Sequence, residues 1–131
     1  MTTACPSSRR PPRPSAVALR LDSAQDHASG LETINGRWAP GNETATKVTL
    51  ENGRAHALAV GVRPEGDNVH ITATLDGRSI VDWTGPTAAL ALRENWALGR
   101  DGVPGLGAYL STVTFEHVRL TMRSGEARLG R

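Results

Sequence analysis

A β-hairpin predicted over residues 69–84 constrains the fold of this chain more than any other stretch. Its first half alternates apolar with polar residues, and a period of two is typical of a half-buried strand. The pair Asp76-Gly77 then favours a type I′ turn, because both central residues of that turn need a positive φ. The returning half contains three residues that favour strands: Ile80, Val81 and Trp83. The chain is therefore predicted to contain an antiparallel sheet.

A two-residue turn also sets the expected pairing of this hairpin. In a regular register, Ala73 lies opposite Ile80, and His70 lies opposite Trp83. The core face would then hold the apolar residues of the first strand together with Ile80. The outer face would hold Trp83 beside His70 and three hydroxyl side chains: Thr72, Thr74 and Ser79.

Further strands are predicted on both sides of the hairpin. They cover residues 16–21, 30–34, 47–50 and 56–63, and two closing strands cover 106–110 and 112–122. Residues 54–84 are thus expected to form a three-stranded meander, and Asn35-Gly36 is a second strong turn signal. Residues 87–93 fit either a short helix with Thr87 as its N-cap or an extended strand.

The last closing strand changes parity along its length. Val113 and Phe115 are odd-numbered, whereas its later apolar residues are even-numbered: Val118, Leu120 and Met122. Because a regular strand cannot bury both sets on one face, we predict a β-bulge near Glu116-His117.

Together these segments predict an all-β fold, an antiparallel β-sandwich of about seven strands. Residues 1–15 are rich in Pro, Ser and Arg and are expected to be a disordered tail, with residues 16–131 forming the single domain. Three of the fifteen basic residues lie in this acid-free tail, so the domain carries twelve basic and thirteen acidic side chains. Without a basic face on the domain, nucleic-acid binding is not expected.

Cysteine and histidine residues give no sign of a metal or cofactor. Cys5 is the single cysteine, so no internal disulfide or cysteine-based metal site is expected. The four histidines are spread singly, without the spacing of metal ligands. No apolar stretch is long enough to span a bilayer, and the basic start lacks the apolar region of a secretory signal. The sequence therefore assigns no compartment.

Catalytic motifs are also absent from the sequence. It contains no nucleophile elbow, no H-E-x-x-H and no Walker phosphate loop. β-Sandwich glycosidases place two carboxylates on one face of a strand, and no predicted strand of this chain does so. We therefore expect a protein that is not an enzyme. The alternative, a glycoside hydrolase, would have to use Asp82, Glu116 and His117 as its acids and bases.

Tryptophan side chains are the candidates for ligand contact. On the outer face of the hairpin, Trp83 beside His70 would let a sugar ring stack, since its C–H face is apolar and its hydroxyls need partners. In the alternative, which we favour, Trp83 packs beneath residues 85–105 near Trp96. Trp38, in the loop of residues 35–42, has the same two interpretations. The candidate ligand-binding residues are Trp83, His70 and Trp38.

Four stretches of the sequence resemble one known superfamily. They are SGLETINGR at 29–37, TLENGRAHALAVGVR at 49–63, ITATLDGRSIVDWTGP at 71–86 and LGAYLSTVTFEHVRLTMRSGEARL at 106–129. Together they are similar to the concanavalin A-like lectin/glucanase superfamily, in the laminin-G-like form found in bacterial multidomain proteins. The LDG hairpin and the closing segment carry this resemblance, which covers residues 16–129.

The resemblance implies a jelly-roll β-sandwich with a binding role. The carboxylate motif of the glucanase members has no counterpart in this sequence, which implies a non-catalytic module for carbohydrate or an accessory domain. Some laminin-G-like domains hold calcium, but Asp67 and Asn68 alone offer too few ligands.

The matched stretches correspond to the C-terminal portion of that sandwich, so an incomplete sandwich is expected. Such a fold exposes an unpaired strand edge, which favours self-association. A truncated structural remnant that binds no ligand is the other alternative.

Overall fold

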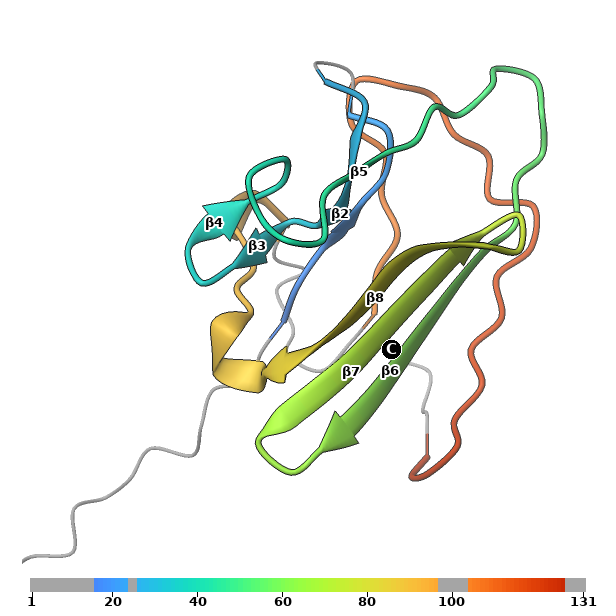
Figure 1. The fold of residues 1–131 in the computed structure, drawn as a ribbon. Coiled ribbons are helices and arrows are strands. Elements are labelled where there is room, and N and C mark those ends of the chain that lie inside the picture. Colours follow the sequence, from blue (N-terminus) through green and yellow to red (C-terminus); the bar gives the residue numbers. More distant parts are fainter. Residues whose placement is uncertain (1–15, 24–25, 97–103, 127–131) are drawn as a thin grey trace, which may run out of the picture.

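Strands make up nearly all of the regular structure in the described part of this protein. The computed structural model describes residues 16–23, 26–96 and 104–126. Within these ranges the strands form three antiparallel sheets, and two short 3₁₀ helices follow the last strand (Figure 1). The predicted all-β class is therefore confirmed. The tail predicted over residues 1–15 lies outside the described residues.

The largest sheet is the predicted three-stranded meander. Its strands are β6 (Leu58–Glu65), β7 (Asn68–Leu75) and β8 (Arg78–Pro86), in the order β6-β7-β8. Between β7 and β8, Asp76 has a φ of 51° and Gly77 a φ of 79°, the positive angles that a type I′ turn needs. On β7 the apolar residues are buried and the polar residues between them are half-buried, as the alternation predicts.

The pairing of β7 with β8 differs from the predicted register. Thr74 pairs with Ser79 as expected, but Ala73 pairs with Val81 instead of Ile80. Ile80 is therefore the extra residue of a β-bulge. Because successive side chains of a strand point to opposite faces, this shift of one residue exchanges the faces of the rest of β8.

The bulge places Trp83 in the hydrophobic core, opposite Ile71. Its side chain is 8% exposed, so the prediction that it shares the outer face with His70 is wrong. The alternative places Trp83 beneath the residues that follow Gly85, which agrees with the presence of Ala89 in the same core. Trp96, predicted as its neighbour, instead bonds to Glu32 and contacts Tyr109. This core joins β7 and β8 to the earlier strands and comprises Leu31, Ile34, Val69, Ile71, Ala73, Val81, Trp83 and Ala89.

Two contacts fix the position of the Trp83 ring. Its Nε1 donates a hydrogen bond of 2.9 Å to Oε1 of Glu43, and this bond lowers the pKa of the Glu43 carboxyl. Gly85 lies directly against the ring, because a Cβ at this position would be 2.4 Å from Cζ2 of Trp83. No side chain fits at position 85 unless the ring moves.

Two smaller sheets are built by the first part of the chain. One has the order β1-β2-β5 and consists of β1 (Leu19–Arg20), β2 (Ala28–Leu31) and β5 (Thr46–Lys47). The other is a hairpin of β3 (Thr33–Ile34) and β4 (Arg37–Trp38). Its turn residues, Asn35 and Gly36, have the predicted positive φ values of 50° and 73°. The strands predicted over 16–21, 30–34 and 47–50 are thus present but shorter or shifted.

Residues 87–93 form neither of the two predicted elements in full. A 3₁₀ helix, η1, spans Thr87–Ala89 with Pro86 at its N-cap, so the prediction of Thr87 as the N-cap is wrong. The Thr87 hydroxyl donates instead to the carbonyl oxygen of Asp67 at 2.7 Å. A second 3₁₀ helix, η2, follows at Glu94–Trp96.

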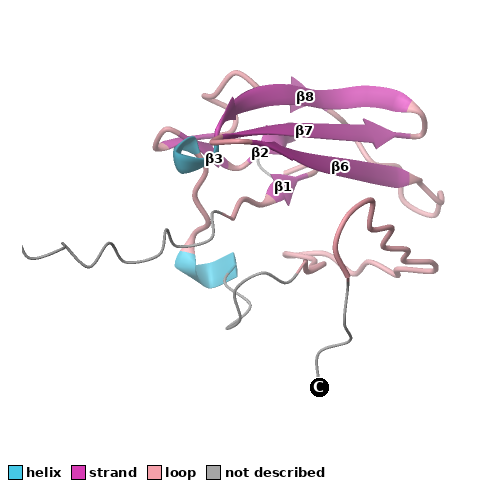
Figure 2. Cartoon of the chain, turned by 90° about the horizontal axis from the view of Figure 1, so that it is seen from below, coloured by secondary structure: helices cyan, strands magenta, loops and turns pink. Residues whose placement is uncertain are grey.

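The two predicted closing strands are absent from the described residues. Residues 104–126 contain no strand and run past β6 as an irregular segment (Figures 1 and 2). An alternating pattern becomes a strand only where a neighbouring strand completes its hydrogen bonds, and no described strand pairs with this segment. The β-bulge predicted at Glu116-His117 is therefore wrong as well.

The carboxylate of Asp76 ties the tip of the hairpin to the start of β6. Its Oδ1 accepts a hydrogen bond of 2.9 Å from the backbone N–H of Ala57, and its Oδ2 accepts one of 2.7 Å from Nδ1 of His56. The Asp76 backbone N–H also donates to the carbonyl oxygen of Ala57 at 2.8 Å. The Ala57 N–H bond, followed by that of His56, lowers the pKa of the Asp76 carboxyl.

Replacing Trp83 with alanine is expected to lower the free energy of unfolding by about 3–5 kcal/mol, the usual cost of removing a buried aromatic side chain. The matched control is Trp38→Ala, at a tryptophan that is 46% exposed, which should cost less than about 1 kcal/mol. Urea denaturation followed by far-UV circular dichroism measures both values. Equal losses in the two variants would contradict the placement of Trp83 in the core.

Acid is expected to destabilise the protein partly through Asp76. Because its pKa in the folded state lies below the ordinary value of 3.8, the stabilisation is complete above the unfolded pKa and is lost as the pH falls through the folded pKa. Asp76→Asn keeps a residue that tolerates positive φ but removes the titration. Urea midpoints measured from about pH 6 to about pH 2 should therefore fall more steeply for the wild type than for this variant.

The control for this experiment is Asp67→Asn, which removes a turn carboxylate that makes no hydrogen bond or ion pair within the described ranges. Parallel curves for the wild type and Asp76→Asn, or the same flattening in Asp67→Asn, would show that the Asp76 carboxylate is not the cause.

Candidate functional site

The three residues predicted to bind a ligand do not form one site. Trp83 is buried in the core. His70 lies on the opposite face of β7, between buried residues. Trp38 belongs to the separate β3–β4 hairpin.

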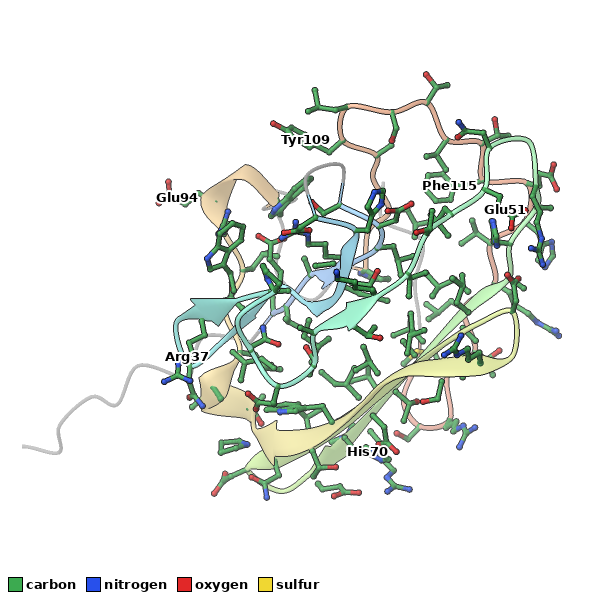
Figure 3. All side chains as sticks on the ribbon, turned by 45° about the horizontal axis from the view of Figure 1, so that its top comes forward. Arg37, Glu51, His70, Glu94, Tyr109 and Phe115 are labelled. Carbon is green, nitrogen blue, oxygen red and sulfur yellow. The ribbon has the colours of Figure 1, made fainter. Side chains whose placement is uncertain are left out.

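His70 lies on the outer face of the large sheet (Figure 3), in a row of charged and polar side chains. Its Nε2 lies 2.7 Å from Oδ1 of Asp82, and its Nδ1 lies 3.3 Å from Nη2 of Arg63. Arg63 also forms an ion pair of 2.7 Å with Glu65. The polar groups of this row thus have partners within the sheet. β6, β7 and β8 contribute no Trp, Tyr or Phe side chain to this face.

Trp38 is exposed and flanked by two arginines. Cζ of Arg93 lies 5.0 Å from the centroid of the Trp38 ring, and Cζ of Arg20 lies 5.6 Å from it. Both distances are within the range of cation–π attraction. Arg20 is held in place by the carbonyl oxygen of Ala39 at 2.8 Å and by the carboxylate of Asp26 at 3.1 Å. The sequence left open whether the Trp38 ring is exposed or packed against other residues, and the exposed ring agrees with this structure.

The carboxylate of Glu32 connects Arg93 to two further aromatic residues. Its Oε1 lies 3.2 Å from Nε of Arg93 and accepts a hydrogen bond of 3.1 Å from Nε1 of Trp96. Trp96 makes an edge-to-face contact with Tyr109, with ring centroids 5.9 Å apart. Glu32 is 7% exposed, so these two donors replace much of the water that a carboxylate would otherwise need.

These contacts connect six residues into one cluster, which we call the aromatic patch. Its members come from segments far apart in the sequence and are Arg20, Glu32, Trp38, Arg93, Trp96 and Tyr109. The patch holds three of the five aromatic residues of the chain. Figure 3 shows Tyr109 on the same side of the molecule as η2, which Glu94 marks. The patch thus combines apolar rings with cationic and anionic groups.

Sequence reasoning identified only Trp38 among the members of this patch. Trp96 was predicted solely as a packing neighbour of Trp83. Glu32 and Tyr109 lie in stretches that carry the family resemblance but have no predicted role, and Arg93 belongs to no recognisable motif. The sequence signal that could have indicated the patch is the scarcity of aromatic residues. The chain has five of them, and placing one outside the core loses hydrophobic burial.

Residues of the enzymatic alternative are not brought together. Asp82 bonds to His70 on the large sheet, whereas Glu116 and His117 lie in the irregular segment of residues 104–126. Over the described ranges, no hydrogen bond or ion pair joins Asp82 to either of them. The same ranges contain no group of three or more His, Cys, Asp or Glu side chains that could hold a metal ion, and none of their helices has the length and apolar character to cross a membrane.

Comparisons with known proteins find no protein similar to this chain. No protein-family model matches the sequence, and neither a search of curated proteins nor a search of solved structures finds a match.

Proposed function

We propose that this protein is a non-catalytic carbohydrate-binding module and that the aromatic patch is its ligand surface. The observation that supports this proposal is the exposed Trp38 ring with the Arg93 guanidinium 5.0 Å from its centroid. A sugar presents an apolar C–H face that stacks on an indole, and its hydroxyls need charged or polar partners beside that ring.

Arg93 is the member of the patch best suited to bond sugar hydroxyls. Its Nε is engaged by Glu32, while its two terminal nitrogens make no hydrogen bond to any described residue. A guanidinium donates several hydrogen bonds in one plane, so these nitrogens can serve adjacent hydroxyls of one sugar. In Arg20, by contrast, both terminal nitrogens already donate hydrogen bonds, one to the carbonyl oxygen of Ala39 and one to the carboxylate of Asp26.

The resemblance to the laminin-G-like domains supports the same proposal. A jelly-roll sandwich of that superfamily, present in part, would act as a lectin-like or accessory module within a larger bacterial protein. The separation of Asp82 from Glu116 and His117 supports a binding role rather than glycoside hydrolysis.

Trp38→Ala is expected to weaken binding to polysaccharides by roughly two- to twelvefold, because a stacking contact contributes roughly 0.5–1.5 kcal/mol. A glycan array selects the ligand, and affinity electrophoresis in gels that contain it measures the retention. Arg93→Gln should lose a similar part of the retention through its hydroxyl contacts. The matched control is His70→Ala, which alters the outer face of the sheet and should leave the retention unchanged.

Three outcomes would contradict this proposal. They are unchanged retention in Trp38→Ala, equal loss in His70→Ala, and turnover of oligosaccharides that disappears in Glu116→Gln. The last result would favour the glycoside hydrolase.

A second proposal concerns the free edge of the large sheet: the edge of β6 pairs with a second copy of this chain. β6 has β7 on one side and no described strand on the other. Its core-side residues, Leu58, Val60 and Val62, are between 41% and 64% exposed. Unpaired backbone groups beside exposed apolar side chains form a template for another strand. Pro64, which lacks an N–H, and the charged Glu65 limit this pairing to the first part of β6.

Light scattering coupled to size-exclusion chromatography is expected to detect a concentration-dependent dimer. Val60→Lys should restore the monomer, because a lysine on an edge strand opposes pairing through the cost of burying its charge. Thr84→Lys, on the opposite edge strand β8, is the matched control and should still dimerise. A wild type that is monomeric at every concentration, or a dimeric Val60→Lys, would overturn this second proposal.

A further inference from the structure

A cleft of about 400 Å³ lies at the tip of the β7–β8 hairpin, apart from the members of the aromatic patch. One side is formed by β5 and the residues that follow it, and the other side by the residues of the hairpin tip. Small-molecule sites in proteins have volumes of roughly 300–1,000 Å³. The cleft is therefore large enough for one sugar-sized molecule.

Acidic side chains in this cleft are already engaged by the protein. Both oxygens of Asp76 accept hydrogen bonds, from the Ala57 N–H and from His56. Glu51 lies 3.4 Å from Nη1 of Arg54. His56 also accepts a hydrogen bond of 3.3 Å from the Glu51 N–H at its Nε2, so both of its ring nitrogens are occupied.

The basic side chains of the cleft are only partly engaged. Lys47 comes from β5 and Arg78 from the start of β8, and both line the cleft. Neither makes an ion pair or side-chain hydrogen bond with any residue in the described part of the chain. With Arg54, they give the cleft three cations against two acids. Because the carboxylates already have partners and two of the cations do not, the net positive charge of the cleft favours an anionic ligand.

Hydroxyl groups add a second kind of partner to the same cleft. Thr46 and Thr49 line it from the β5 side. A hydroxyl both donates and accepts hydrogen bonds, so it suits the hydroxyls of a polyol. Arg78 in turn suits a carboxylate or phosphate, which its guanidinium can bind with two parallel hydrogen bonds.

We propose that this cleft binds a small polyhydroxylated anion, with its carboxylate or phosphate between Lys47 and Arg78 and its hydroxyls toward Thr46 and Thr49. The proposal is independent of carbohydrate binding at the aromatic patch. It assigns a ligand class, sugar acids or sugar phosphates, to a surface of this domain that the stacking site does not use.

The experiment is a titration of the ¹⁵N-labelled full chain, followed through its amide resonances, with four probes. D-glucuronate tests a carboxylated sugar, glucose 6-phosphate tests a phosphorylated one, glucose is the neutral analogue, and inorganic phosphate tests the anion alone. We expect saturable shifts of the residue 47 and residue 78 amides with one or both sugar anions, and at least tenfold weaker binding of glucose. Added salt should weaken the interaction, because exposed charges are screened.

Arg78→Gln and Lys47→Gln are each expected to weaken this binding by about tenfold, a loss of roughly 1.4 kcal/mol. Arg119→Gln removes an exposed arginine from the irregular segment and should have no effect. Trp38→Ala should leave anion binding intact, so failure here and failure at the aromatic patch can be told apart.

The relative affinities of glucuronate and glucose 6-phosphate identify the source of the anion. Binding of glucose as strong as that of the sugar anions, binding of inorganic phosphate alone, or equal loss in Arg119→Gln would overturn the proposal. An absence of saturable shifts with all four probes would overturn it as well.

Discussion

The burial of Trp83 depends on one extra residue in β8, and much of the remaining structure depends on that burial. In a regular hairpin, Asp82 would lie opposite Ile71, and an unpaired carboxylate would face the core at a large cost in desolvation. The bulge at Ile80 turns Asp82 outward to His70 and turns Trp83 inward. The indole then reaches Glu43, which attaches the loop after β4 to the meander. One inserted residue thereby decides which side chains form the core and which face water.

That loop supplies the hydrogen bonds that a neighbouring strand would otherwise give to the end of β2. Asn42 Nδ2 donates to the carbonyl oxygen of Leu31 at 2.8 Å, and Thr44 Oγ1 accepts from the Leu31 N–H at 2.9 Å. The Thr44 hydroxyl in turn donates to Oδ1 of Asn42 at 2.7 Å. A buried polar network in which each group is satisfied fixes a single arrangement. It holds the backbone next to Glu32, the carboxylate around which the aromatic patch assembles.

How far the sequence predicts this fold depends on whether the information is local. Asp76-Gly77 and Asn35-Gly36 predict their turns, because positive φ is a property of these residues themselves. The alternation on β7 predicts its buried face for the same reason. The sequence also contains a signal for the bulge in β8. Ile80 is even-numbered whereas Val81 and Trp83 are odd-numbered, so all three can lie toward the core only if one residue is extra. Residues 112–122 alternate as a strand does, yet no described strand pairs with them, and pairing is not a local property.

The aromatic patch was missed because its members meet through Glu32, from segments up to 89 positions apart between Arg20 and Tyr109.

The contact between Gly85 and the Trp83 ring has a consequence for how sequences related to this one can diverge. A side chain at position 85 would require a smaller residue at position 83, and loss of the indole would leave the Glu43 carboxylate without its donor. Positions 43, 83 and 85 can therefore change only together. Position 43 lies far from the other two in the sequence, and positions 83 and 85 hold very different residues, tryptophan and glycine. In a set of homologues they should form a correlated trio, with glycine at 85 wherever tryptophan occupies 83. Such a trio would mark the descendants of this bulged hairpin even where the surrounding loops have diverged beyond alignment.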